Sequence, residues 1–225
     1  MNEIFTKTAL LGDVWVLWIL LFASILSVAV MIDRWWIFRK NRLDFSGFLA
    51  KLKVHLEAGA VDAARELCTG REAIEARVTL AGLENFSRGP ASVEEAMKGS
   101  LVLERGFFER NLVVLSTLGN NAPFIGLLGT VLGVIKAFHD LGVAGSSGVS
   151  IVMAGISSAL IATAFGILLA IPAVIANNIF QTRLKRSSQN AQSLIHLLQV
   201  YLRAESKKLP RRQAERNPQL GEVNP

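Results

Sequence analysis

The chain has 225 residues, of which 51% are hydrophobic and 19% charged, and its formal net charge is +6. Its mean hydropathy of +0.40 is typical of a membrane protein that carries a polar portion. In a soluble protein the positive charge would suggest nucleic acid, but here Lys and Arg cluster just beyond apolar stretches, so we expect no nucleic-acid partner. The single cysteine, Cys68, permits no internal disulfide and gives no metal cluster, and we expect neither a metal nor another cofactor.

The first apolar stretch, residues 13–33, predicts a transmembrane helix, because about 20 helical residues cross the hydrocarbon core of a bilayer. It is too long for the apolar part of a signal peptide, so we expect no cleavage there. Arg34, Arg39, Lys40 and Arg42 follow it, and by the positive-inside rule this end is cytoplasmic. Residues 1–12 are therefore predicted to be an N-terminal segment on the outer side of the membrane.

Residues 34–111 are more polar, and their apolar side chains recur at helical spacing. A helix is predicted to begin at Ser92, because Glu95 three residues later completes a capping box. Its pattern runs without a breaker into the next apolar stretch. These features predict a cytoplasmic helical domain.

Residues 112–138 and 151–179 predict the second and third transmembrane helices. Residues 139–150 between them hold no Lys or Arg, as expected for a loop on the outer side of the membrane. Basic residues after the third span place residues 180–209, a predicted helix, in the cytoplasm. Pro210 is expected to end that helix, and residues 210–225 are expected to form a disordered tail.

Small residues line one face of the second and third spans at steps of three or four. Such a face lets a neighbouring backbone approach closely, which in lipid replaces the hydrophobic drive for packing. We therefore expect this face to lie inside an assembly. The predicted packing residues are Gly119, Gly126, Gly129, Gly133, Gly155, Ala159 and Gly166, and the predicted helix kinks are at Pro123 and Pro172.

Thr130 and Thr163 lie near the middle of the second and third spans, at a similar depth because the two helices run in opposite directions. One interpretation is that each hydroxyl bonds the carbonyl four residues back in its own helix. An intramembrane enzyme with Ser157 or Ser158 as nucleophile would need a nearby base. No His, Lys or acidic residue lies near mid-depth of any span, so we predict that the chain is not an enzyme.

Two blocks of the sequence resemble the MotA/TolQ/ExbB proton channel family. The first block comprises Leu118, Gly119, residues 122–134 (APFIGLLGTVLGV) and Phe138. The second comprises Gly155-Ile156-Ser157, residues 159–164 (ALIATA), Gly166, residues 170–174 (AIPAV) and Asn177. The length, the three spans and the position of the cytoplasmic domain resemble the TolQ/ExbB branch of the family.

The resemblance implies an all-α protein of the bacterial inner membrane, whose long helices extend into a cytoplasmic helical bundle. It also implies that residues 1–12 are a periplasmic N-terminal segment and residues 139–150 a periplasmic loop. It implies a homo-pentamer around single-span partners of the ExbD/TolR type, each with an intramembrane Asp. The implied function is that of a proton-channel or stator subunit in a motor driven by the proton motive force. Tol-Pal, TonB-type transport and gliding motility are the candidate processes, with TonB/TolA-like or motility proteins as further candidate partners.

The resemblance places the family's pore threonines at Thr130 and Thr163. We expect Ser158 to line the same proton path. TolQ and ExbB carry a Glu where this chain has Ser158, which suggests a divergent paralogue such as a gliding-motility motor. The alternative function is a structural membrane scaffold or a passive pore without energy coupling.

Overall fold

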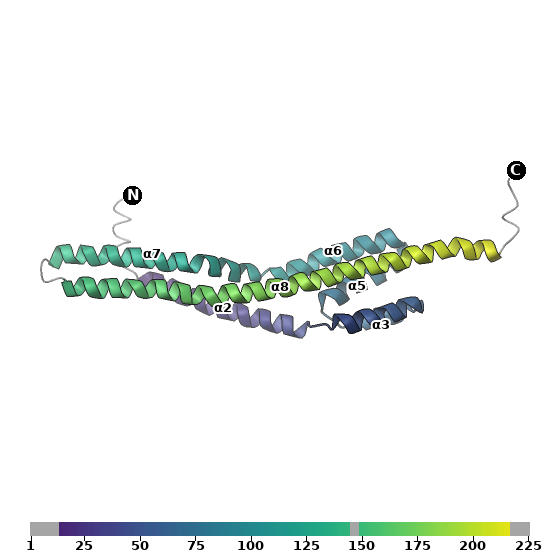
Figure 1. Ribbon diagram of the computed structural model, residues 1–225, viewed down its shortest axis with the longest axis horizontal. Coiled ribbons are helices and arrows are strands. Elements are labelled where there is room, and N and C mark those ends of the chain that lie inside the picture. Colours follow the sequence, from purple (N-terminus) through teal and green to yellow (C-terminus); the bar gives the residue numbers. More distant parts are fainter. Residues whose placement is uncertain (1–13, 145–148, 217–225) are drawn as a thin grey trace, which may run out of the picture. The chain divides into compact units, whose positions relative to one another are not determined.

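The computed structural model describes residues 14–144 and 149–216, and in these two ranges the regular elements are all helices (Figure 1). The chain divides into two compact units, which are described separately. The apolar unit consists of the described parts of residues 1–37 and 110–181. The polar unit consists of residues 38–109 and the described part of residues 182–225.

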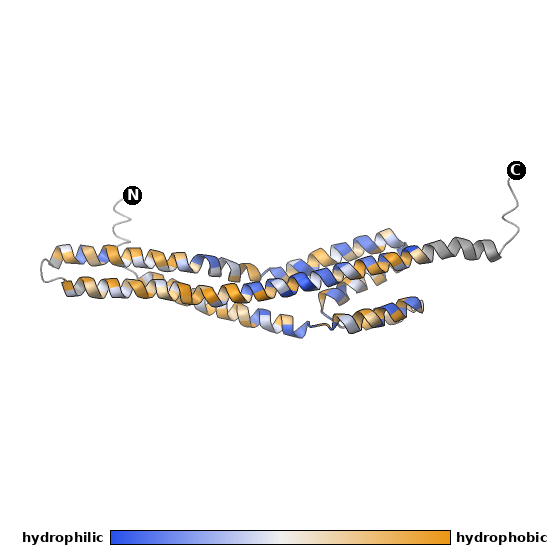
Figure 2. Cartoon of the chain, in the orientation of Figure 1, coloured by the Kyte–Doolittle hydropathy of each residue, from blue (hydrophilic) through white to orange (hydrophobic). Residues whose placement is uncertain are grey.

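The apolar unit is built from α2 (Val14–Lys40), α7 (Leu112–Ala144) and the first part of α8 (Val149–Arg216). Each of these helices is long and apolar enough to cross a membrane. Figure 2 shows hydrophobic residues over most of α7 and the beginning of α8. In the described residues the predicted all-helical class with three long apolar helices is confirmed, and it fits a membrane protein.

One face of α2 packs against the other two helices of the apolar unit. The buried cluster consists of Val16, Leu20 and Ala23 of α2, Ala122 and Leu132 of α7, and Leu169 and Ala170 of α8. The opposite face of α2 exposes large apolar side chains, among them Trp18, Phe22 and Ile25. A helix in lipid exposes such side chains at no cost, so α2 combines a packed face with an apolar open face.

The polar unit is a set of packed helices: α3 (Phe45–Glu57), α4 (Val61–Cys68), α5 (Ile74–Glu84), the 3₁₀ turn η1 (Phe86–Arg88), α6 (Pro90–Glu109) and the later part of α8. Its core is apolar, with Leu52, Val78 and Met97 fully buried. One buried carboxylate crosses this core: Glu75 of α5 is 3% exposed, and its Oε1 accepts a hydrogen bond of 3.2 Å from Nδ2 of Asn190 in α8.

The predicted continuous helix through residues 110 and 111 is wrong, because α6 ends at Glu109 and α7 begins at Leu112. Asn111, in the turn between them, donates from Nδ2 to Oδ2 of Asp33 at 3.2 Å. This long-range bond holds the turn to α2. The start of α6 also differs, at Pro90 rather than Ser92, because a proline at the first helical position lacks only an N–H that the helix would leave unused.

Two further boundaries lie outside the predicted ranges. The second and third spans continue into the predicted loop 139–150, since α7 reaches Ala144 and α8 begins at Val149. The predicted end of α8 at Pro210 is wrong: the helix runs on to Arg216, because an internal proline removes one backbone hydrogen bond without preventing the next turns from forming. Residues 1–12 and the end of the predicted tail, 217–225, lie outside the described residues.

Candidate functional site

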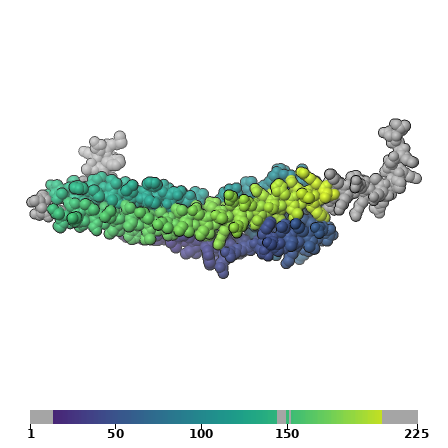
Figure 3. Space-filling view, in the orientation of Figure 1, coloured from purple at the N-terminus to yellow at the C-terminus, as the bar shows by residue number. Residues whose placement is uncertain are grey.

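Where α7 and α8 meet, two glycines bring the backbones together, and Figure 3 shows the two helices side by side. A Cβ at Gly126 would lie 2.7 Å from the carbonyl oxygen of Ala162 and 3.0 Å from Cα of Thr163. A Cβ at Gly166 would lie 2.6 Å from the carbonyl oxygen of Ala122. These atoms belong to backbone, which cannot swing away, so the site admits only glycine at either position without parting the helices.

Three of the other predicted packing residues, Gly119, Gly129 and Gly155, also face a neighbouring helix. A Cβ at Gly129 would lie 2.7 Å from Cβ of Ala162 and 3.1 Å from Cγ1 of Val16, so α2 also approaches here. Gly119 faces Val174, Gly155 faces Ala137, and Gly133 and Ala159 are buried. Within this single chain the small-residue face is thus occupied by the chain's own helices, whereas the sequence suggested contacts inside an assembly.

The close approach brings together two hydroxyls, those of Thr130 on α7 and Thr163 on α8. Their Oγ1 atoms form a hydrogen bond with each other. Oγ1 of Thr130 also lies 3.2 Å from the carbonyl oxygen of Ala159, and Oγ1 of Thr163 lies 3.2 Å from that of Gly126. Both threonines are half-buried.

The two hydroxyls can donate only two hydrogen bonds between them, fewer than the surrounding oxygen atoms could accept. Oγ1 of Thr130 also lies 3.3 Å from the carbonyl oxygen of Gly126 in its own helix, so the local bond weighed as an alternative competes with the bonds between helices for the one proton of this hydroxyl. Each hydroxyl donates once and accepts from others. Either Thr130 donates to Thr163, which then donates to Gly126, or Thr163 donates to Thr130, which then donates to a carbonyl.

No ionisable side chain stands beside this pair along either helix. Residues 112–135 and 152–182 contain no Asp, Glu, Lys, Arg or His. Ser158, one residue before Ala159, is half-buried and is the remaining polar side chain of the predicted set. Among the residues that the structure describes, no group of three His, Cys, Asp or Glu could hold a metal ion.

Two predicted features gain no direct test from the geometry. α7 stays helical through Pro123 and α8 through Pro172, so a kink at each remains a prediction.

Sequence reasoning missed two parts of the apolar unit. One is the carbonyl of Gly126, an acceptor for both threonines, although its place four residues before Thr130 could have suggested it. The other is a polar cluster in which Arg34, only 5% exposed, donates from Nη2 to Oδ2 of Asp33 at 2.8 Å. Asn111 donates to the same oxygen, and local sequence patterns could not predict this bond because the two residues are 78 positions apart in the chain.

Three apolar helices that pack through small residues around a pair of hydroxyls define a multi-pass membrane protein with a polar, uncharged contact in its interior. The sequence profile of the MotA/TolQ/ExbB proton channel family matches residues 71–193, more than half of the chain. The chain belongs to this family, and within it to the TolQ/ExbB-like proteins.

Several curated relatives support this assignment. The chain is 49% identical over 69 residues to the biopolymer transport protein ExbB of Helicobacter pylori, a match that covers 31% of this chain and 48% of the relative. It is 40% identical over 114 residues to the Tol-Pal system protein TolQ of Pseudomonas aeruginosa, covering 46% and 49%. With ExbB of Neisseria gonorrhoeae the identity is 39% over 95 residues, covering 42% and 43%. The chain therefore matches about half the length, or less, of these relatives.

Proposed function

We propose that this chain is the channel-forming subunit of a motor in the bacterial inner membrane that is driven by the proton motive force. Its partner in this proposal is a single-span protein of the ExbD/TolR type. The observation that supports the proposal is the Thr130–Thr163 pair, two hydrogen-bonded hydroxyls on adjoining helices of the apolar unit. Membership of a proton channel family supports it.

A proton that crosses about 30 Å of hydrocarbon needs a titrating group or an unbroken file of water. Threonine hydroxyls do not titrate at physiological pH, and residues 112–135 and 152–182 offer no other ionisable group. The titrating group therefore comes from another chain, most simply an Asp on the partner's single helix. A homo-pentamer of this chain surrounds that helix, with Thr130, Thr163 and Ser158 toward it. The hydroxyls bond the carboxylate and hold water beside it.

The proposed orientation follows from the distribution of Lys and Arg. The N-terminus lies in the periplasm, and the polar unit and the C-terminus lie in the cytoplasm. With its partner the complex powers a process at the outer membrane or cell surface, either Tol-Pal function, TonB-type transport or gliding motility. TonB/TolA-like or motility proteins would receive the energy.

The test is proton flux into liposomes under a pH gradient. We expect the purified chain alone to give background flux, and flux to appear with the partner and to vanish when the partner's Asp becomes Asn. A steady proton current through this chain alone would show that the essential carboxylate has been assigned to the wrong protein. Absence of proton flux with the intact partner would favour the alternative function, a structural membrane scaffold without energy coupling.

The hydroxyls are tested by Thr130→Val with Thr163→Val, because Val keeps the volume of Thr and removes its hydroxyl. We expect a folded oligomer with strongly reduced flux. Thr117→Val, on the exposed face of the same helix, is the matched control and should leave flux unchanged. Full flux in the double variant would refute a role of this pair in the proton path.

A further inference from the structure

The polar unit contains a hollow of about 260 Å³ between two connectors. One wall is formed by residues 40–43, which lead from α2 into α3, and the other by residues 70–73, which lead from α4 into α5. Gly70 has a φ of +77°, a conformation that lets the second connector turn sharply before α5. The hollow is separate from the threonine pair, which belongs to the apolar unit.

The side chains around this hollow carry an excess of positive charge. Lys40, Arg42 and Arg71 contribute three cations, and Glu72 contributes one carboxylate. Nζ of Lys40 lies 3.1 Å from Oε2 of Glu72. The guanidinium of Arg71 lies over the ring of Phe48, 6.0 Å from its centroid, and this contact holds Arg71 at the wall.

The start of α5 adds backbone donors to these cations. α5 begins at Ile74, directly after the wall residue Ala73, which is the N-cap and has no side chain that could cap the helix. The first N–H groups of a helix lack the usual carbonyl partner four residues back. At the start of α5 the N–H of Ala76 donates to the carbonyl of Ala73 at 3.1 Å, so Ile74 and Glu75 carry the N–H groups that could serve a ligand. The helix dipole also favours an anion at this end. Two arginines, a lysine and an uncapped helix start are together suited to a phosphate group.

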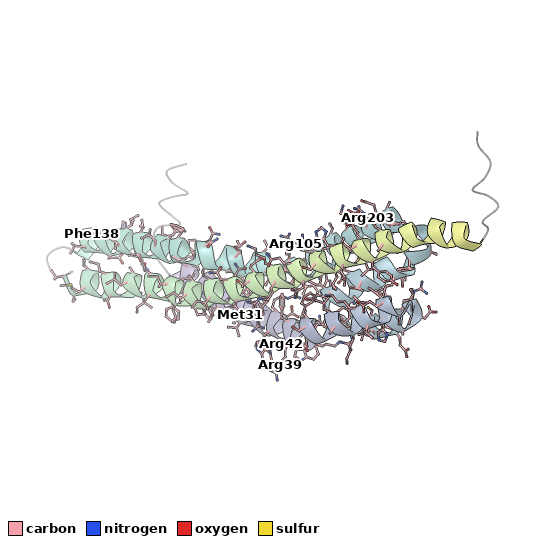
Figure 4. All side chains as sticks on the ribbon, turned by 45° about the vertical axis from the view of Figure 1, so that its right-hand side comes forward. Met31, Arg39, Arg42, Arg105, Phe138 and Arg203 are labelled. Atoms are coloured by element: carbon pink, nitrogen blue, oxygen red, sulfur yellow. The ribbon has the colours of Figure 1, made fainter. Side chains whose placement is uncertain are left out.

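We propose that this hollow binds the phosphate of an anionic phospholipid headgroup. Lys40 is the last residue of α2, and the exposed Trp35 and Trp36 precede it by about 6 to 8 Å of helical rise. Exposed tryptophans at the end of an apolar span mark the headgroup level of a membrane. In Figure 4, Arg39 and Arg42 lie near each other at the junction of α2 and α3. A soluble phosphate has the same charged group, so the experiment must separate the two sources.

The experiment is native mass spectrometry of the purified full chain in detergent, with phosphatidylglycerol or zwitterionic phosphatidylcholine added. The fraction of lipid-bound protein gives an apparent affinity for each lipid. Arg42→Gln with Arg71→Gln removes two cations from the hollow. Lys51→Gln with Lys53→Gln removes two exposed cations from α3, outside the hollow, and is the matched control. Glu72→Gln removes the carboxylate that competes for Lys40.

A charge near an anionic lipid changes affinity by about fivefold. We therefore expect phosphatidylglycerol to bind at least tenfold more weakly to the double arginine variant, several-fold more tightly to Glu72→Gln, and unchanged to the lysine control. Phosphatidylcholine should respond to none of them. Equal losses in the arginine and lysine variants, or no gain in Glu72→Gln, would overturn the site.

A competition arm assigns the source of the phosphate. Millimolar inorganic phosphate should leave the bound phosphatidylglycerol in place. If inorganic phosphate displaces the lipid from the natural chain but has no effect on the double arginine variant, the hollow binds soluble phosphate and the lipid assignment is wrong. None of these readouts depends on proton conduction, so the inference stands apart from the proposed function.

Discussion

Gly126→Ala tests whether the contact between α7 and α8 is as close as the structure places it. The added Cβ would lie 2.7 Å from the carbonyl oxygen of Ala162, whereas ordinary contacts begin at 3.4 Å. The helices must therefore part by about 0.7 Å at this point, the difference between these two distances. Overpacking of this kind costs about 1–3 kcal/mol of unfolding free energy.

Replacement of glycine by alanine also favours a helix by about 1 kcal/mol, which opposes the clash. Gly142→Ala, on the same helix, measures that gain alone, because a Cβ at Gly142 has nothing within 4 Å. The difference between the two variants therefore isolates the clash. At about 2–4 °C per kcal/mol for a chain of this size, Gly126→Ala should melt several degrees below Gly142→Ala in detergent, as followed by circular dichroism.

A second variant sharpens this test. Gly126 and Gly166 face each other, since a Cβ at Gly166 would lie 3.1 Å from Cα of Gly126. Once one added Cβ has parted the helices, the second has more room, so the double variant should lose less stability than the sum of the single losses. The same melting temperature for Gly126→Ala and Gly142→Ala would refute the close contact. If the double variant lost as much stability as the two single variants together, the two glycines would not share one point of contact.

Other predictions concern single side chains. A carboxylate at the centre of a lipid bilayer costs about 2.5–3.5 kcal/mol. Ser158→Glu should lower the stability of the folded protein by less than this, because the proposed function puts this position beside a hydrated path. Loss of the folded oligomer would contradict that proposal. Asn190→Ala leaves the buried Glu75 without this donor and should lower the unfolding free energy by about 1–3 kcal/mol in denaturant titrations, whereas the exposed Gln189→Ala should not. Burial raises the pKa of the Cys68 thiol from 9.0 to about 12, so iodoacetamide at pH 8.5 should modify it only after unfolding. Because the folded state disfavours the thiolate, stability should fall as the pH rises above about 9, and rapid alkylation of the native chain would contradict this.

Hydropathy and periodicity predicted the spans and the face on which the small residues lie, because excluding charge from lipid is a large effect that a short stretch of sequence reveals. Thr130 and Thr163 were placed at one depth by counting residues along antiparallel helices. Counting residues could not predict that both threonines share the carbonyl of Gly126 as an acceptor, because this contact depends on how far each helix is rotated about its axis. Periodicity also shows that a face is packed without showing whether the same chain or another covers it.

The turn at residues 110 and 111 escaped prediction for a similar reason. Nothing in the neighbouring sequence breaks the helix there, and the bond from Asn111 to Asp33 joins residues far apart in the chain. At Pro210 the sequence predicted a helix end where there is none: proline usually ends a helix, but α8 continues to Arg216.

The threonine pair has a direction, because one hydroxyl must point at the other and the second at a carbonyl. The two arrangements differ by turning both O–H bonds, which moves a dipole but no net charge. A proton handed through such a pair enters at one oxygen and leaves from the other, and it leaves both O–H bonds reversed. The pair cannot pass a second proton the same way until both have rotated back. If the pair lies in the proton path proposed above, each passage along it therefore consists of a hop and a turn, and the flux should fall in deuterated water.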